Sequence, residues 1–154
     1  MQARLQRFLP IGKAFDIVGS NLYVVHQRVA KKFRAGRAVL AGDSAHVNSP
    51  IGAMGMNSGI HDAFNLAEKL VSILRGEADA AVLDRYERQR RHVALQHTQA
   101  QTMRNKRLLT EKDPAVRRKN HDELRRTAED PKLARAFLLR SSLIESLREA
   151  AQIP

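Results

Sequence analysis

The sequence has no cysteine and no tryptophan among its 154 residues, and aromatic residues make up only 5% of it. The lack of cysteine excludes disulfide bonds, a thiolate nucleophile and any metal site of the cysteine type. Much of the 43% hydrophobic content is alanine, so the chain can bury only a thin core. The length is that of one ordinary domain.

Long hydrophobic runs are also missing. No stretch approaches the roughly 18 consecutive apolar residues that a membrane-spanning helix needs. The first residues, MQARLQR, lack the apolar core of a signal peptide. We therefore expect no membrane span and a cytoplasmic location.

Acidic residues are few: the sequence has 16 aspartates and glutamates against 27 lysines and arginines, which gives a net charge of +11. The basic residues concentrate between Arg85 and Arg126. Such a stretch can bind nucleic acid, an anionic membrane surface or an acidic partner, or form a solvated helix face. It could also pair with acidic residues outside this chain. No helix-turn-helix signal, zinc-finger spacing or aromatic stacking platform accompanies it, which argues against nucleic acid.

The sequence pattern predicts a helix-dominated α+β fold, with two or three short strands followed by about four helices. We expect a short helix over residues 2–9, ended by Pro10. Residues 22–29 are rich in β-formers and predict a strand, and residues 16–18 predict another short one. The next strand, residues 37–41, follows a polar turn.

The second half predicts helices almost throughout. A helix starting near residue 57 carries apolar residues at the helical period, which predicts a buried stripe of Ile60, Ala63, Phe64, Ala67, Leu70, Val71 and Leu74. Asp79 is placed to cap a second helix running to about Leu109. Asp-Pro pairs at 113–114 and 130–131 predict two more helices, the last ending near residue 150. We assign residues 1–110 and 111–154 to a main domain and a helical extension packed on it.

The most informative segment reads GRAVLAGDSAH over residues 36–46 and PIGAMGMN over residues 50–57. A short buried strand ends at Gly42-Asp43, and a glycine-rich loop then leads into a helix. This order sets one carboxylate at the end of a strand and a row of backbone N–H groups at a helix start. Such a place can hold a polyhydroxylated, partly anionic cofactor.

Residues 37–74 closely resemble the second FAD-binding motif of the aromatic-hydroxylase flavoprotein monooxygenases, the p-hydroxybenzoate hydroxylase-like family. The chain continues the motif as PIGAMGMNSGIHDAFNLAEKL from Pro50, and HQRVA at residues 26–30 resembles the family's lead-in. Ser44 replaces a usual alanine, and Glu68 stands where many members have tryptophan. The resemblance implies a piece of a Rossmann-like monooxygenase fold with FAD as cofactor. It also implies NAD(P)H as co-substrate, and a phenolic substrate that is hydroxylated with oxygen.

The family's N-terminal Gly-x-Gly-x-x-Gly unit, which holds the FAD pyrophosphate, is absent. The first glycines, Gly12 and Gly19, are isolated. We therefore expect the C-terminal portion of a monooxygenase that is inactive alone. Its N-terminal FAD-binding half would lie in the same gene or on a separate chain.

Residue chemistry and the resemblance together indicate six cofactor-binding residues: Asp43, Pro50, Gly52, Gly55, Met56 and Asn57. The carboxylate of Asp43 suits the ribityl hydroxyls, since charge-assisted hydrogen bonds contribute about 1.5–3 kcal/mol. The glycines allow close approach to the flavin ring, and the helix-start amides favour negative charge there. Arg28 and His46 are further candidates, His46 mainly for orienting the loop. No catalytic residue can be named.

Other clusters predict little. The six histidines lack metal-ligand spacing, and His92 and His97, five apart on a helix, should diverge, so we expect no metal site. Asp43, Ser44 and His46 are too close in sequence to form a hydrolase triad.

Two alternatives remain open. The chain could be a non-catalytic basic helical module that binds an acidic partner or nucleic acid, or one subunit of a two-chain enzyme. The helices beyond residue 110 could also make a homodimer contact.

Overall fold

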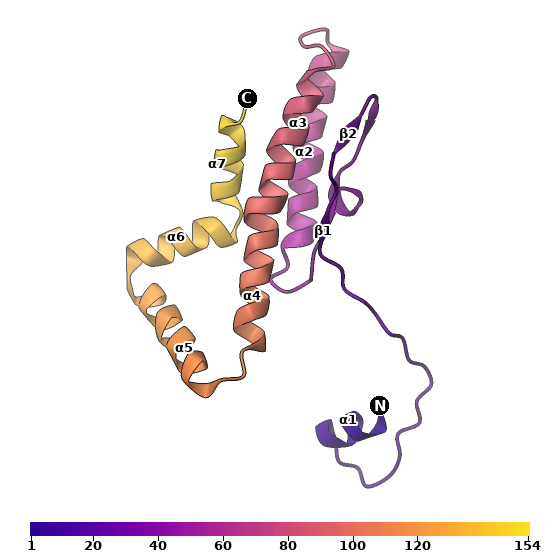
Figure 1. Cartoon of the computed structure of the whole chain (residues 1–154), viewed down its shortest axis with the longest axis vertical. Coiled ribbons are helices and arrows are strands. Elements are labelled where there is room, and N and C mark those ends of the chain that lie inside the picture. Colours follow the sequence, from indigo (N-terminus) through magenta and orange to yellow (C-terminus); the bar gives the residue numbers. More distant parts are fainter.

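The structure is a computed structural model that describes every residue from 1 to 154. It is mostly helical, with a few two-residue strands (Figure 1). Helix α2 (Met54–Leu74) lies beside a long helical rod formed by residues 82–110, and the strands lie along one side of this pair. The helix-dominated α+β prediction is confirmed.

The N-terminal region begins with α1 (Gln2–Phe8), close to the predicted helix, and continues as an extended chain (Figure 1). The predicted strand at residues 16–18 does not form. Of the strand predicted over residues 22–29, only β1 (Arg28–Val29) forms. Leu22 and Tyr23 are exposed, and no neighbouring strand offers hydrogen bonds to this stretch. β-propensity without a pairing partner is not enough to make a strand.

Two small antiparallel pairs follow. Strand β1 pairs with β4 (His46–Val47), so that Arg28 faces Val47 and Val29 faces His46. Strands β2 (Arg34–Ala35) and β3 (Ala38–Val39) form a hairpin. The strand predicted over residues 37–41 is therefore present but short. A single 3₁₀ turn, η1 (Gly42–Ser44), connects β3 to β4.

The long helices form largely as expected. Helix α2 begins three residues earlier than predicted, directly after Ala53, whose φ of 54° lies in the left-handed region. The helix predicted between Asp79 and Leu109 is present as one continuous rod. It consists of α3 (Val82–Val93), the π-helix η2 (Ala94–Gln99) and α4 (Ala100–Thr110).

Three helices complete the chain: α5 (Pro114–Glu129), α6 (Pro131–Ser141) and α7 (Ile144–Gln152). The N-caps predicted at Asp113 and Asp130 are observed, but the one predicted at Asp79 is wrong. Helix α3 has Ala81 as its N-cap, and the Asp79 carboxylate accepts from Ala81 N at 2.6 Å in the turn before the helix. The carboxylate of Asp113 accepts from Ala115 N at 2.7 Å, and that of Asp130 accepts from Lys132 N at 2.8 Å. The single last helix predicted from sequence is instead two, because Leu143 adopts a left-handed φ of 62° between them.

The core is thin, as the composition predicts. It centres on four buried residues, Phe33, Ala45, Tyr86 and Ala94. The predicted buried stripe on α2 is wrong for this chain, because Phe64 is 69% exposed and Leu74 87% exposed. No element of the chain packs over that face. None of the helices is both long enough and apolar enough to cross a bilayer.

Candidate functional site

Asp43 lies on the exposed tip of the η1 turn. The turn is closed by Ser44, whose Oγ donates to Ala41 O at 2.8 Å and accepts from Ala41 N at 3.2 Å. Gly42 has a φ of 61°, a conformation that glycine adopts without strain. The Asp43 carboxylate is exposed and accepts no hydrogen bond from the rest of the chain. It is therefore free to accept bonds from a ligand.

Beneath this turn, Asp62 of α2 forms the centre of a buried polar network. Its Oδ2 accepts from Gly42 N at 3.0 Å and lies 2.8 Å from His46 Nε2. Its Oδ1 accepts from Arg90 Nε at 2.6 Å. Asp62 and Arg90 are completely buried, and His46 is 3% exposed. One carboxylate thus fastens the η1 turn, strand β4 and helix α3 to one another.

The network keeps Asp62 ionised. Burial alone would raise the pKa of Asp62, but the hydrogen bond with His46 and the Arg90 guanidinium outweigh it and lower that pKa below its usual value. Arg90 also donates from Nη2 to Ser58 O at 3.3 Å. A buried charge pair of this kind is strongly destabilising to break.

Sequence reasoning missed this network. Arg90 was counted with the basic stretch, and Asp62 was given no role. The available signal was the spacing of Met54, Ser58 and Asp62, which recur every four residues and form the buried face of α2. A carboxylate at that period, on a helix otherwise packed against the chain, requires a partner.

Close backbone packing also fixes the turn. A Cβ added to Gly59 of α2 would lie 3.3 Å from the Cα of Gly42, so the helix and the turn approach with no room for a side chain. Tyr86 of α3 donates from its hydroxyl to Leu40 O at 2.7 Å and so holds the end of the preceding strand.

The glycine-rich loop carries polar groups around the start of α2. Gly52 has a φ of 98°, and the side chain of Asn105 lies against it. Beside Gly55, the amide Nδ2 of Asn48 is buried without a hydrogen-bond partner. No side chain caps α2, so the N–H groups of its first turn lack partners within the helix.

The other candidates lie around the same turn and loop. Pro50 and Met56 are exposed, and Asn57 bonds back to Ala53 O at 3.4 Å. Arg28 is exposed on β1, next to the strand that carries His46. His46 itself points inward to Asp62 and stacks on Phe33, with ring centroids 6.2 Å apart. Its ring therefore orients the β4 strand and does not reach solvent.

The basic stretch is partly structural. Besides the buried Arg90, Arg85 donates to Ile153 O at 3.1 Å and Arg88 to Pro154 O at 2.9 Å. These contacts fasten the C-terminal residues to α3. By contrast, α5 buries no residue and carries its basic side chains in solvent.

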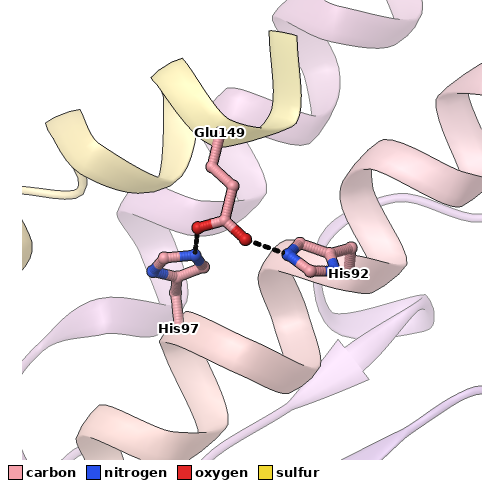
Figure 2. Close-up of side chains that lie close together, drawn as sticks. All are labelled: His92, His97 and Glu149. Atoms are coloured by element: carbon pink, nitrogen blue, oxygen red, sulfur yellow. Dashed lines mark hydrogen bonds and ion pairs between the residues drawn. The ribbon is translucent and has the colours of Figure 1, made fainter. Parts of the chain in front are cut away.

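The prediction that His92 and His97 diverge is wrong. Their rings lie 6.1 Å apart and both bond Glu149 of α7 (Figure 2). The hydrogen bond with His92 lowers the pKa of Glu149 below its usual value. The wide turn of the π-helix between the two histidines is the physical reason, and it could not be read from sequence.

Comparison with known proteins identifies the family. The FAD binding domain family matches residues 12–101. The para-nitrophenol 4-monooxygenase of Pseudomonas sp. strain WBC-3 is 38% identical over 139 residues, which are 88% of this chain and 34% of that protein. A 3-(3-hydroxy-phenyl)propionate/3-hydroxycinnamic acid hydroxylase of Mycolicibacterium smegmatis is 45% identical over 87 residues, 56% of this chain and 16% of that protein.

Solved structures agree. The crystal structure of p-nitrophenol 4-monooxygenase from Pseudomonas putida DLL-E4 superposes with a TM-score of 0.77 and 36% identity. It covers 95% of this chain and 37% of that one. CabE, an aromatic hydroxylase from angucycline biosynthesis, gives a TM-score of 0.72 at 29% identity, over 92% of this chain and 28% of that one. The chain thus spans about a third of the length of these relatives or less. It belongs to the FAD-binding domain family of aromatic hydroxylases and corresponds to one part of such an enzyme.

Proposed function

We propose that this chain supplies the flavin side of the FAD site in an NAD(P)H-dependent monooxygenase that hydroxylates a phenolic substrate. The observation that carries the proposal is the free carboxylate of Asp43, set on a turn that the Asp62 network holds rigidly beside the uncapped start of α2. FAD, when bound, supplies the redox and oxygen chemistry, and the protein positions it.

The donors and acceptors present fit the ribityl and ring portion of FAD. Asp43 would accept from the ribityl hydroxyls, as a carboxylate with no internal partner can. The first-turn amides of α2, around Gly55, Met56 and Asn57, would donate to the electron-rich edge of the ring. The buried Nδ2 of Asn48 is a further donor in the same region that lacks a partner.

The remaining candidates would act around this centre. Pro50 and Gly52 would shape the loop beside the ring, since Gly52 holds a backbone conformation that a side chain would strain. His46 would position the turn through Asp62. Arg28 is exposed near the same strand pair and would contact flavin or substrate.

We also propose that an N-terminal FAD-binding portion, in the same gene or on another chain, covers the apolar face of α2. We define this face as Ile60, Phe64, Val71 and Leu74. All four are exposed here, and Phe64 and Leu74 most of all. Contiguous exposed apolar surface of this kind typically marks an interface. Residues 1–110 would then contribute to the FAD domain, with residues 111–154 as a helical extension.

Binding of FAD tests this proposal. The chain alone should not retain stoichiometric FAD, because it lacks the pyrophosphate-binding unit. A chimaera in which this chain replaces the matching segment of the Pseudomonas sp. para-nitrophenol 4-monooxygenase should retain it. In that chimaera, Asp43→Asn should weaken FAD binding about 10- to 100-fold, the equivalent of one charge-assisted hydrogen bond.

Asp122→Asn is the matched control, because Asp122 is an exposed aspartate on α5 away from the turn. It should leave FAD binding unchanged. A folded chimaera in which Asp43→Asn binds FAD as tightly as the parent would refute the assignment. Strong, salt-sensitive DNA binding by a chimaera that takes up no FAD would favour the basic interaction module instead.

A further inference from the structure

Three potential metal ligands converge on the side of the molecule away from the η1 turn. His92 lies in the last turn of α3, His97 lies in the π-helix η2, and Glu149 lies on α7 (Figure 2). His92 Nε2 is 2.5 Å from Glu149 Oε1, and His97 Nε2 is 2.8 Å from Oε2. The donor atoms of all three residues lie within 4.8 Å of one another.

The π-helix creates this convergence. In a regular α-helix, residues five apart are separated by about 140° around the axis, so two histidines at that spacing could not share one carboxylate. The i→i+5 turn of η2 is wider and brings His92 and His97 to the same side. Short π-helical segments of this kind occur often at functional sites.

From this geometry we propose that His92, His97 and Glu149 form a binding site for a divalent transition metal, with Zn²⁺ as the ion that fits best. Two imidazoles and one carboxylate are an established zinc ligand set that leaves a fourth position for water. A zinc ion that binds each donor atom at about 2.0–2.2 Å would hold the three donor atoms closer together than the 4.8 Å within which they lie in this structure. Rotation of the partly exposed side chains supplies the required movement.

The surroundings leave the site accessible. The side chains of His92, His97 and Glu149 are 34%, 18% and 45% exposed, and those of His92 and Glu149 line a shallow groove of about 490 Å³. Two arginines also line this groove, but both guanidinium groups are engaged elsewhere. Arg88 donates to Pro154 O and Arg91 to Ala30 O. Since Glu149 is more than 50 residues from either histidine, a bound ion would fasten α7 to the long helical rod.

Calorimetric titration of the tag-free chain with Zn²⁺ tests the proposal. We expect one saturable site per chain. Glu149→Gln and His97→Gln should each weaken Zn²⁺ binding at least tenfold, because even groups that only support a metal ligand contribute 10- to 100-fold. His121→Ala, which alters an exposed histidine on α5, should bind as the parent does.

A second measurement covers the case in which a variant folds poorly. Zn²⁺ should raise the thermal unfolding midpoint of the unmodified chain, since it binds the folded state, and it should not raise that of Glu149→Gln. Co²⁺ in place of Zn²⁺ should give the unmodified chain a visible absorption band that Glu149→Gln lacks. No saturable Zn²⁺ binding to the unmodified chain, or equal binding by Glu149→Gln, would overturn the proposal.

Discussion

The two faces of helix α2 reverse the usual arrangement of a surface helix. The face toward α3 and the η1 turn is buried and carries Ser58 and Asp62. The opposite face carries Phe64 and Leu74 in solvent. A helix of a complete domain normally buries its apolar stripe and exposes its polar one. The polar face of α2 is therefore buried within this chain, and the apolar face is left uncovered.

The difference between the two faces separates the contacts that this chain makes by itself from those that need another protein surface. The Asp62 carboxylate finds its partners within this chain, since Arg90, His46 and Gly42 N all lie within the 154 residues. Nη1 of Arg90 and Nδ1 of His46 are buried without a partner of their own. The Asp62 carboxylate can hold the Asp43 turn in place without outside help. The apolar face offers no hydrogen bonds and gains stability only by burial against another surface.

The largest expected effect on stability comes from removing the buried charge pair on the polar face of α2. Arg90→Ala leaves the Asp62 charge buried without its partner, so it should lower the free energy of unfolding by about 3–5 kcal/mol. Urea denaturation followed by circular dichroism measures this. Arg107→Ala, at an exposed arginine on α4, is the control and should change stability by less than about 0.5 kcal/mol. A loss below about 1 kcal/mol for Arg90→Ala would show that the pair does not fasten the fold.

Acid should gradually remove the stability that the ionised Asp62 contributes. The pKa of Asp62 in the folded chain lies below its unfolded value of 3.8. Its contribution to stability is therefore complete above about pH 4 and is lost as the pH falls through the folded-state pKa. The stability difference between the parent and Asp62→Asn should shrink below about pH 4, as measured by urea denaturation at a series of pH values. A difference that stays constant into strong acid would contradict the ionised pair.

Tyr86→Phe should have a smaller effect. It removes the hydroxyl that donates to Leu40 O and leaves that carbonyl without its partner, which costs about 1–3 kcal/mol. Tyr23→Phe is the matched control, because Tyr23 is exposed in the N-terminal segment and should be insensitive. Equal stability of the two variants would mean that the hydrogen bond from Tyr86 to Leu40 O makes no net contribution to the free energy of unfolding.

The smallest effect is expected on the apolar face. Phe64→Ser should change the stability of the isolated chain by no more than about 0.5 kcal/mol, because the side chain is mostly in solvent. In the FAD-binding chimaera the same substitution should cost about 3–5 kcal/mol if the ring is buried there. Similar small effects in both proteins would indicate that nothing covers this face.

The sequence predicted local features well and tertiary contacts poorly. The N-caps at Asp113 and Asp130 were correct because a side chain bonding its own helix start depends only on neighbouring residues. The glycine-rich turn was located for the same reason. The strand over residues 22–29 failed because a strand needs a partner, and the apolar stripe of α2 was placed inside because its period does not reveal which surface covers it.

Only part of the candidate site could be predicted from the sequence. Asp43 and the loop glycines belong to a contiguous motif, so their place on a turn beside a helix start could be predicted. The bond from Arg90 to Asp62 joins residues 28 apart and depends on how α2 packs on α3. The meeting of His92 and His97 depends on a π-helix, for which the sequence holds no signal of its own.

Cysteine accessibility tests the contrast between the two faces most directly, because the chain contains no cysteine of its own. Phe64→Cys and Ser58→Cys place one thiol on the apolar and on the buried polar face of α2. In the isolated chain, the thiol at position 64 should react rapidly with a maleimide and that at position 58 should not. In a cysteine-free version of the chimaera both should be protected. Rapid labelling at position 64 in a chimaera that holds FAD would contradict the account.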